Sequence, residues 1–228
     1  MRDPLVVTVN KSLNPILWDI DGNLKPIVAD KLITIADAFY EFMGVKLNII
    51  DLTITGSNAN YTWNSHSDID LHLVVSGVPS TDDRELFNAK KAVWSDQHAI
   101  TIKGIPVEVY IQGNSEVHYS TGIYSILEDE WVVEPKKQKP SIDDAAVHAK
   151  KDEVVELIEE ALMDDDLPKL KNIKEKVIRM RKAGLERAGE WSTENIVFKI
   201  LRNTGMIDEI VHKIHELEDK ALSMENTQ

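Results

Sequence analysis

The chain has 228 residues, of which 43% are hydrophobic, and its 26 basic and 39 acidic side chains give a formal net charge of −13. This acidic balance argues against a protein that coats nucleic acid non-specifically, because phosphate binding needs clustered Lys and Arg. The absence of cysteine excludes disulfides, thiolate metal ligands and a thiol nucleophile. No apolar run approaches the roughly 20 residues that span a bilayer, and the first residues lack the apolar stretch of a secretion signal. We therefore expect a soluble, cytoplasmic protein with no membrane partner.

The first two-thirds of the sequence mixes helical and strand patterns. Apolar residues recur at helical spacing from Pro26 until Gly44, and residues 81–98 predict a second helix with acids in its first turn. Lys103-Gly104 is typical of a turn between two strands. Strands are expected at residues 5–9, 49–55 and 69–75. Two more are expected on either side of that turn, and the one at 107–111 has the stronger strand pattern. Short strands are also expected around Tyr124 and at 131–133.

The last third of the sequence predicts helices alone. Residues 135–140 (PKKQKP) are typical of a linker, and apolar residues then recur at spacings of three and four up to residue 162. Three aspartates at 164–166 and Pro168 are expected to break this helix, and further helices are predicted at 170–182, 194–203 and 206–224. The sequence thus predicts an α+β fold, with a mixed sheet and flanking helices in a domain of residues 1–135 and an all-helical domain at 141–228.

Two aspartates separated by one residue mark the start of the apolar run of residues 69–75. The first lies just before the run and the second lies within it. On a strand, Asp68 and Asp70 point to the same side, away from the aliphatic side chains between and after them. Like charges this close oppose each other's ionisation, and a bound cation relieves that cost. Carboxylates are the expected ligands of Mg²⁺, which takes one or two of them together with substrate phosphate oxygens. The pair therefore predicts a metal site.

Two further elements extend this site. Glu108 is an acid between two valines on another predicted strand, and three acids on two neighbouring strands could hold two divalent ions, as in in-line phosphoryl displacement. Gly56-Ser57 ends the strand at 49–55: a glycine lets backbone approach a phosphate closely, and the Ser57 hydroxyl can donate a hydrogen bond.

Together these elements resemble the DNA polymerase beta-type nucleotidyltransferase superfamily. The pattern is Gly56-Ser57, a spacer of ten residues, Asp68-Ile69-Asp70-Leu71, and later the third acid in Val107-Glu108-Val109. The resemblance covers about residues 45–112. This part of the sequence is similar to the small stand-alone members, such as minimal and aminoglycoside nucleotidyltransferases. It has a fainter likeness to short nucleotidyltransferase-like proteins of tailed phages. Thr55 departs from the pattern, which usually has an apolar residue there.

The resemblance implies transfer of a nucleoside monophosphate from a nucleoside triphosphate to an acceptor hydroxyl, with release of pyrophosphate. It implies that Asp68 and Asp70 hold Mg²⁺ or Mn²⁺, with two ions expected, and that Glu108 binds the second ion or acts as general base. Gly56 and Ser57 would hold the β and γ phosphates. The acceptor is a small molecule, a protein hydroxyl or an RNA 3′ end, and the helical domain is a candidate for binding it.

Several alternatives stay open from the sequence. A catalytically silent nucleotide-binding protein, of regulatory or antitoxin type, would keep the fold, and a metal-dependent phosphohydrolase would use the same carboxylates. The segment 169–187 carries eight basic residues and two acids, which either bind triphosphate or RNA or balance the acids at 152–166. Five other residues near the acids either touch substrate or serve only in packing: Tyr61, Trp63, His72, Tyr110 and Gln112.

Overall fold

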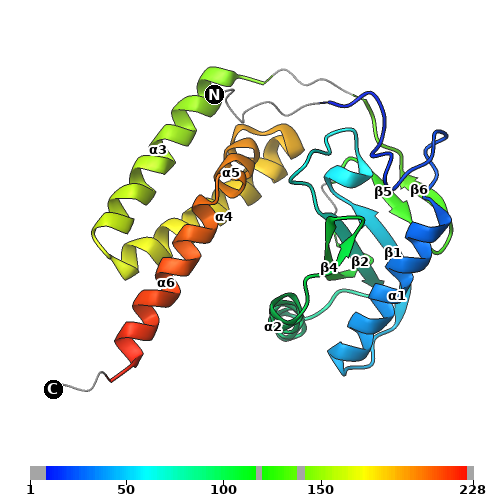
Figure 1. Ribbon diagram of the computed structural model, residues 1–228, viewed down its shortest axis with the longest axis horizontal. Coiled ribbons are helices and arrows are strands. Elements are labelled where there is room, and N and C mark those ends of the chain that lie inside the picture. The colour runs from blue at the N-terminus through cyan, green and yellow to red at the C-terminus, as the bar shows by residue number, and fades with distance from the viewer. Residues whose placement is uncertain (1–8, 117–119, 138–141, 225–228) are drawn as a thin grey trace. The chain divides into compact units, whose positions relative to one another are not determined.

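The computed structural model describes residues 9–116, 120–137 and 142–224 (Figure 1). They divide into two compact units, one within residues 8–139 and the other within 140–228. The described part of the first unit is a mixed sheet with helices, and that of the second is helical, so the predicted α+β class is confirmed. The strand expected at 5–9 falls almost entirely outside the described residues. The functional domains predicted at 1–135 and 141–228 stay a prediction.

A single mixed sheet organises the described part of the first unit, with strand order β3-β4-β2-β1-β5-β6. The two central strands, β1 (Ile49–Thr55) and β2 (Ile69–Val75), are antiparallel and have the bounds that the sequence predicted. β4 (Ile105–Gly113) lies on the other side of β2 and runs parallel to it. β3 (Thr101–Ile102) joins β4 through the expected turn at Lys103-Gly104.

Two helices cover one face of this sheet. α1 (Pro26–Met43) packs on β2 and ends at Gly44, as predicted, and α2 (Thr81–Gln97) packs on β4 (Figure 1). Burial alternates strictly along β2, where the odd-numbered residues from 69 to 75 are buried in the core and the even-numbered ones are half-buried. The helices therefore pack on the aliphatic face, and the acid-bearing residues lie on the opposite one.

Aromatic packing holds the far edge of the sheet. β5 (Ile123–Ser125) pairs with β1 and β6 (Glu130–Val133) pairs with β5, close to the two short strands expected there. The ring of Trp18 stacks on Trp131 at 4.7 Å between centroids and meets Tyr124 edge-on at 5.0 Å. All three rings belong to the sheet unit, so the segment before α1 is part of its core.

The described part of the second unit contains four α-helices: α3 (Asp144–Met163), α4 (Leu167–Ala188), α5 (Thr193–Asn203) and α6 (Met206–Leu222). The side chains of Asp143, Asp166 and Ser192 cap the first three by accepting backbone N–H bonds. Their apolar faces form one buried cluster that includes Ile158 and Leu201. No helix in the described part of the chain combines the length and apolarity needed to cross a membrane.

One helix boundary differs from the prediction. α4 begins at Leu167 and ends at Ala188, whereas the sequence pattern predicted residues 170–182. The predicted break is present, because α3 ends at Met163, but Pro168 lies in the first turn of α4, where a helix needs no N–H donor, and Asp166 caps that turn.

Tyr124 provides a test of this packing at high pH. Burial, followed by the hydrogen bond that its hydroxyl donates to Asp129 Oδ1 at 2.6 Å, raises the pKa of Tyr124 to about 12. The unfolded chain, with a tyrosine pKa of about 10, then loses this proton first, so the residue costs stability as the pH rises between those two values. We expect Tyr124→Phe to flatten the fall in unfolding free energy over that interval in urea titrations. An unchanged slope would contradict the assignment.

Candidate active site

The predicted acids of two strands lie side by side. β2 and β4 pair in parallel register, with Asp70 directly opposite Glu108 and His72 opposite Tyr110. Because side chains of paired residues project from the same face, the two carboxylates share the face that α1 and α2 leave uncovered. The prediction that two neighbouring strands would bring these acids together is thus met by the strand pairing.

Asp68 comes just before β2, and a buried asparagine fixes its backbone. Asn58 is fully buried and donates from Nδ2 to the carbonyl oxygen of Asp68 at 2.8 Å. The Asn58 side-chain oxygen accepts from Asn14 at 2.8 Å, and its main-chain carbonyl accepts from the Trp18 indole at 2.7 Å. These bonds tie the start of β2 to the turn after β1, so Asn58 holds the position from which Asp68 projects.

Gly56 allows Asp70 to approach the end of β1. Its backbone has φ 73° and ψ −158°, a conformation essentially restricted to glycine. A Cβ built on Gly56 would lie 1.9 Å from Asp70 Oδ2, well inside van der Waals contact. The space that a side chain would need is therefore taken by the carboxylate, and the Gly-Ser turn and the paired acids form one structure.

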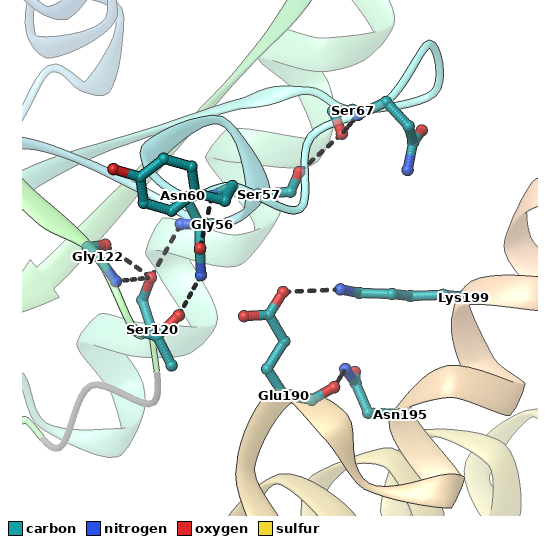
Figure 2. A network of polar contacts seen from close by, with 12 residues as sticks. Gly56, Ser57, Asn60, Ser67, Ser120, Gly122, Glu190, Asn195 and Lys199 are labelled. Atoms are coloured by element: carbon teal, nitrogen blue, oxygen red, sulfur yellow. Dashed lines mark hydrogen bonds and ion pairs between the residues drawn. The ribbon is translucent and has the colours of Figure 1, made fainter. Parts of the chain in front are cut away.

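Hydrogen bonds hold the turn that follows Gly56, as Figure 2 shows. Ser57 begins a short 3₁₀ turn, Ser57–Ala59, and its hydroxyl donates to Ser67 Oγ at 2.8 Å. The Gly56 N–H donates to Ser120 Oγ at 3.1 Å, and that hydroxyl in turn donates to the carbonyl of Gly122 at 2.7 Å. The segment after β1 is thus joined both to the residues before Asp68 and to those before β5.

Glu108 has two partners that the sequence did not reveal. Lys91, on α2, places Nζ 3.0 Å from Glu108 Oε2, and the same oxygen accepts the Tyr110 hydroxyl at 2.5 Å. The Lys91 ammonium also lies 3.4 Å from the centroid of the Tyr110 ring. The side chain of Glu108 is 42% exposed, so the pair is accessible to a ligand in solution. Lys90 and Lys91 are equivalent in the sequence, and only the docking of α2 distinguishes them.

Three carboxylates influence the Tyr110 hydroxyl. Burial raises the pKa of Tyr110 far above its usual range, and the negative charges of Asp70, Glu108 and Asp68 raise it further, together with the bond to Glu108. The phenol therefore stays protonated and acts as a hydrogen-bond donor within a strongly negative field.

These carboxylates fit one divalent cation. Asp68 and Asp70 could supply the one or two protein carboxylates that Mg²⁺ usually takes, which would leave its other positions to water and phosphate oxygens. Within residues 9–116, 120–137 and 142–224, however, no group of three or more His, Asp or Glu side chains is placed to hold a metal ion. Glu108 is bonded through Oε2 to Lys91 and the Tyr110 hydroxyl, and its role as a metal ligand stays a prediction.

The other candidate side chains make contacts within the sheet unit. His72 contacts Thr55 Oγ1 through Nε2 at 3.1 Å and stacks on Tyr110 at 4.9 Å. The Trp63 indole donates to a backbone carbonyl at residue 12, and the carbonyls of Tyr61 and Trp63 accept from Asn10. These contacts favour loop anchors over base-stacking platforms. Gln112 is half-buried on β4, and its Oε1 has no hydrogen-bond partner.

The basic segment 169–187 is largely neutralised within the helical unit. Five of its residues pair with acids of that unit: Lys169 with Glu160, Lys171 with Glu218, Lys176 with Glu153, Arg179 with Glu175, and Arg187 with Glu194. The guanidinium of Arg181 lies 4.3 Å from the ring centroid of Phe198. The contacts favour a charge-balanced helix face over a dedicated phosphate-binding surface.

Comparison with known proteins leaves the family open. No protein-family model and no curated protein matches the sequence. A search of solved structures finds similarity to a STING-associated CdnE c-di-GMP synthase from Capnocytophaga granulosa, at 17% identity over 89% of this chain and 70% of that chain. Its TM-score is 0.25, which is too low to support an argument about fold or activity.

The contact between Gly56 and Asp70 can be tested by a double-mutant cycle. Gly56→Ala should destabilise the protein by about 2–4 kcal/mol, because it adds backbone strain and a collision with Asp70. In an Asp70→Ala background the collision is gone, so the cost should fall by about 1 kcal/mol or more. Unfolding in urea, followed by tryptophan fluorescence, measures both values.

Gly189 supplies the matched control. It has nearly the same backbone conformation, φ 69° and ψ −157°, but a Cβ there would meet no atom within 4 Å. Gly189→Ala should therefore show strain alone and cost the same in both backgrounds. Equal costs of Gly56→Ala with and without the Asp70 carboxylate would contradict the proposed contact.

Proposed function

We propose that this protein is a metal-dependent nucleotidyltransferase that moves a nucleoside monophosphate from a nucleoside triphosphate to an acceptor hydroxyl. The observation that carries the proposal is the contact of Asp70 with Gly56 on one side and its register with Glu108 on the other. These two contacts of Asp70 bring the three separated sequence elements of the superfamily pattern together at the exposed face of one sheet.

The proposed roles follow from this arrangement. Asp68 and Asp70 hold a Mg²⁺ or Mn²⁺ ion, which when bound offsets the negative charge of the phosphate oxygens. Gly56 leaves room for the phosphate chain beside its backbone, and Ser57 Oγ, now directed to Ser67, offers it a hydroxyl. These residues would hold the triphosphate with its α-phosphorus toward the acids.

The proposed reaction balances as an in-line displacement. The acceptor oxygen forms a bond to the α-phosphorus, and the bond from that phosphorus to the α,β-bridging oxygen breaks, so that pyrophosphate leaves with the electron pair. Glu108 accepts the proton of the acceptor hydroxyl as general base. Its carboxylate is partly exposed on the face that carries Asp70, where an acceptor can reach it.

The acceptor class is the least determined part of the proposal. The net charge of −13 favours a small molecule or a protein hydroxyl over a long polyanion. The ion pairs along segment 169–187 also favour a small molecule or a protein hydroxyl, because they balance most of the positive charge on that helix. An RNA 3′ end would need a different basic surface.

Activity can be tested with α-labelled ATP, CTP, GTP and UTP, each with Mg²⁺ or Mn²⁺, and with tRNA, bulk RNA or a cell lysate as the source of acceptor. We expect pyrophosphate release and a labelled acceptor, and Asp70→Asn should lower both by about 100-fold or more, since it removes a metal-binding charge. Asp37→Asn is the matched control, because Asp37 is an exposed aspartate on α1. It should leave the activity unchanged.

Two outcomes would overturn the enzymatic proposal. Equal activity of the unchanged protein and Asp70→Asn would show that the carboxylate pair does not catalyse the reaction. Saturable nucleotide binding by calorimetry without turnover of any nucleotide would instead favour a silent nucleotide-binding protein of regulatory type.

A further inference from the structure

Lys91, from the helix α2 that links β2 to β4, places its positive charge beside Glu108. Lys91 Nζ lies 3.0 Å from Glu108 Oε2, and its side chain is only 23% exposed. Its position is further fixed by the Tyr110 ring, whose centroid is 3.4 Å from the ammonium. A lysine ammonium is a compact point charge, so a single positive charge is built into this part of the site.

The neighbouring acids do not supply the ligands of a second ion. Two-metal sites place the ions about 4 Å apart and need a carboxylate that bridges or completes the second ion. Glu108 is the acid beside Asp70 in the sheet, and its Oε2 is bonded to both Lys91 and the Tyr110 hydroxyl. Consistently, the described residues contain no cluster of three His, Asp or Glu side chains arranged for a metal.

Charge balance agrees with this arrangement. Asp70 and Glu108 are directly opposite each other in the sheet, and Asp68 stands two residues before Asp70. The Lys91 ammonium offsets the charge of Glu108, and one divalent ion would offset charge at Asp68 and Asp70. The Lys91 ammonium therefore lowers the repulsion among the carboxylates, which would otherwise need a second metal ion.

We propose that Lys91 takes the place of a second metal ion, so that Asp68 and Asp70 hold a single divalent cation and Lys91 neutralises Glu108. This inference rests on the proposed function and revises the two-ion expectation that the superfamily resemblance implies. Lys91 acts through Glu108 and is a positioning residue.

The number of bound ions can be read directly by electron paramagnetic resonance with saturating Mn²⁺ and inorganic tripolyphosphate, a phosphate chain without a base. The unchanged protein should bind one Mn²⁺ per chain and give the signal of isolated ions. Lys91→Met should bind two and give a spin-coupled signal, because Glu108 is then available as a ligand. Lys91→Arg, which keeps the charge, should restore the single ion.

Two further variants serve as controls. Lys90→Met changes the adjacent lysine, whose Nζ lies 5.5 Å from the Phe42 ring centroid, and should leave one ion. Glu108→Gln should also leave one ion with its affinity changed less than about threefold, since Glu108 is not its ligand. This second variant tests the inference even if Lys91→Met does not fold.

The outcomes separate this inference from the proposed function. A spin-coupled pair in the unchanged protein that is lost in Glu108→Gln, or a single ion in a folded Lys91→Met, overturns the role of Lys91 and leaves the nucleotidyltransferase proposal in place. No bound Mn²⁺ in any of these proteins, with no turnover in the labelling assay, overturns both.

Discussion

The approach of the Asp70 carboxylate to the backbone of Gly56 is the contact on which the candidate site depends. It requires a residue without a side chain at the end of β1 and an acid at the second position of β2, and the antiparallel pairing of these strands brings the two together. The register is held in turn by the buried odd-numbered residues of β2, because a shift by one residue would move aliphatic side chains to the open face. Core packing thus sets the geometry of the polar face.

A carboxylate cluster of this kind is costly unless its charge is offset, and the sheet unit offsets it in two different ways. Lys91 and the Tyr110 hydroxyl both engage Glu108, while Asp68 is positioned through its backbone by Asn58. The ammonium and the phenol hydroxyl stabilise the Glu108 carboxylate in the folded protein, whereas the Asn58 bond fixes only the main chain of Asp68. In the proposed site the two ends of the cluster are chemically unequal, because a fixed ammonium lies at Glu108 and a bound metal ion would lie at Asp68 and Asp70.

The sequence predicted most of the fold, because its signals are local. The bounds of β1 and β2 follow from apolar runs closed by turns, and the ends of α1 and α5 from Pro26, Gly44 and a capping Ser192. The pairing of Asp70 with Glu108 was inferable because both stand in aliphatic strands. Lys91 and Asn58 were not, since their importance arises from contacts across 17 and 10 residues of chain that no periodicity records. The break near Pro168 was predicted correctly, but the start of α4 was placed three residues late, because a proline is also accepted in the first turn of a helix.

The parallel pairing of β2 and β4 has a consequence for how the site is assembled. Parallel neighbours need a crossover connection, and here that connection contains α2, the helix that carries Lys91. The same segment that makes the central pairing topologically possible also delivers the counter-charge to it. A slip of α2 by one helical turn would move the ammonium by about 5.4 Å while leaving the strands paired. Correct docking of α2 is therefore required, in addition to strand pairing, to place Lys91 beside Glu108.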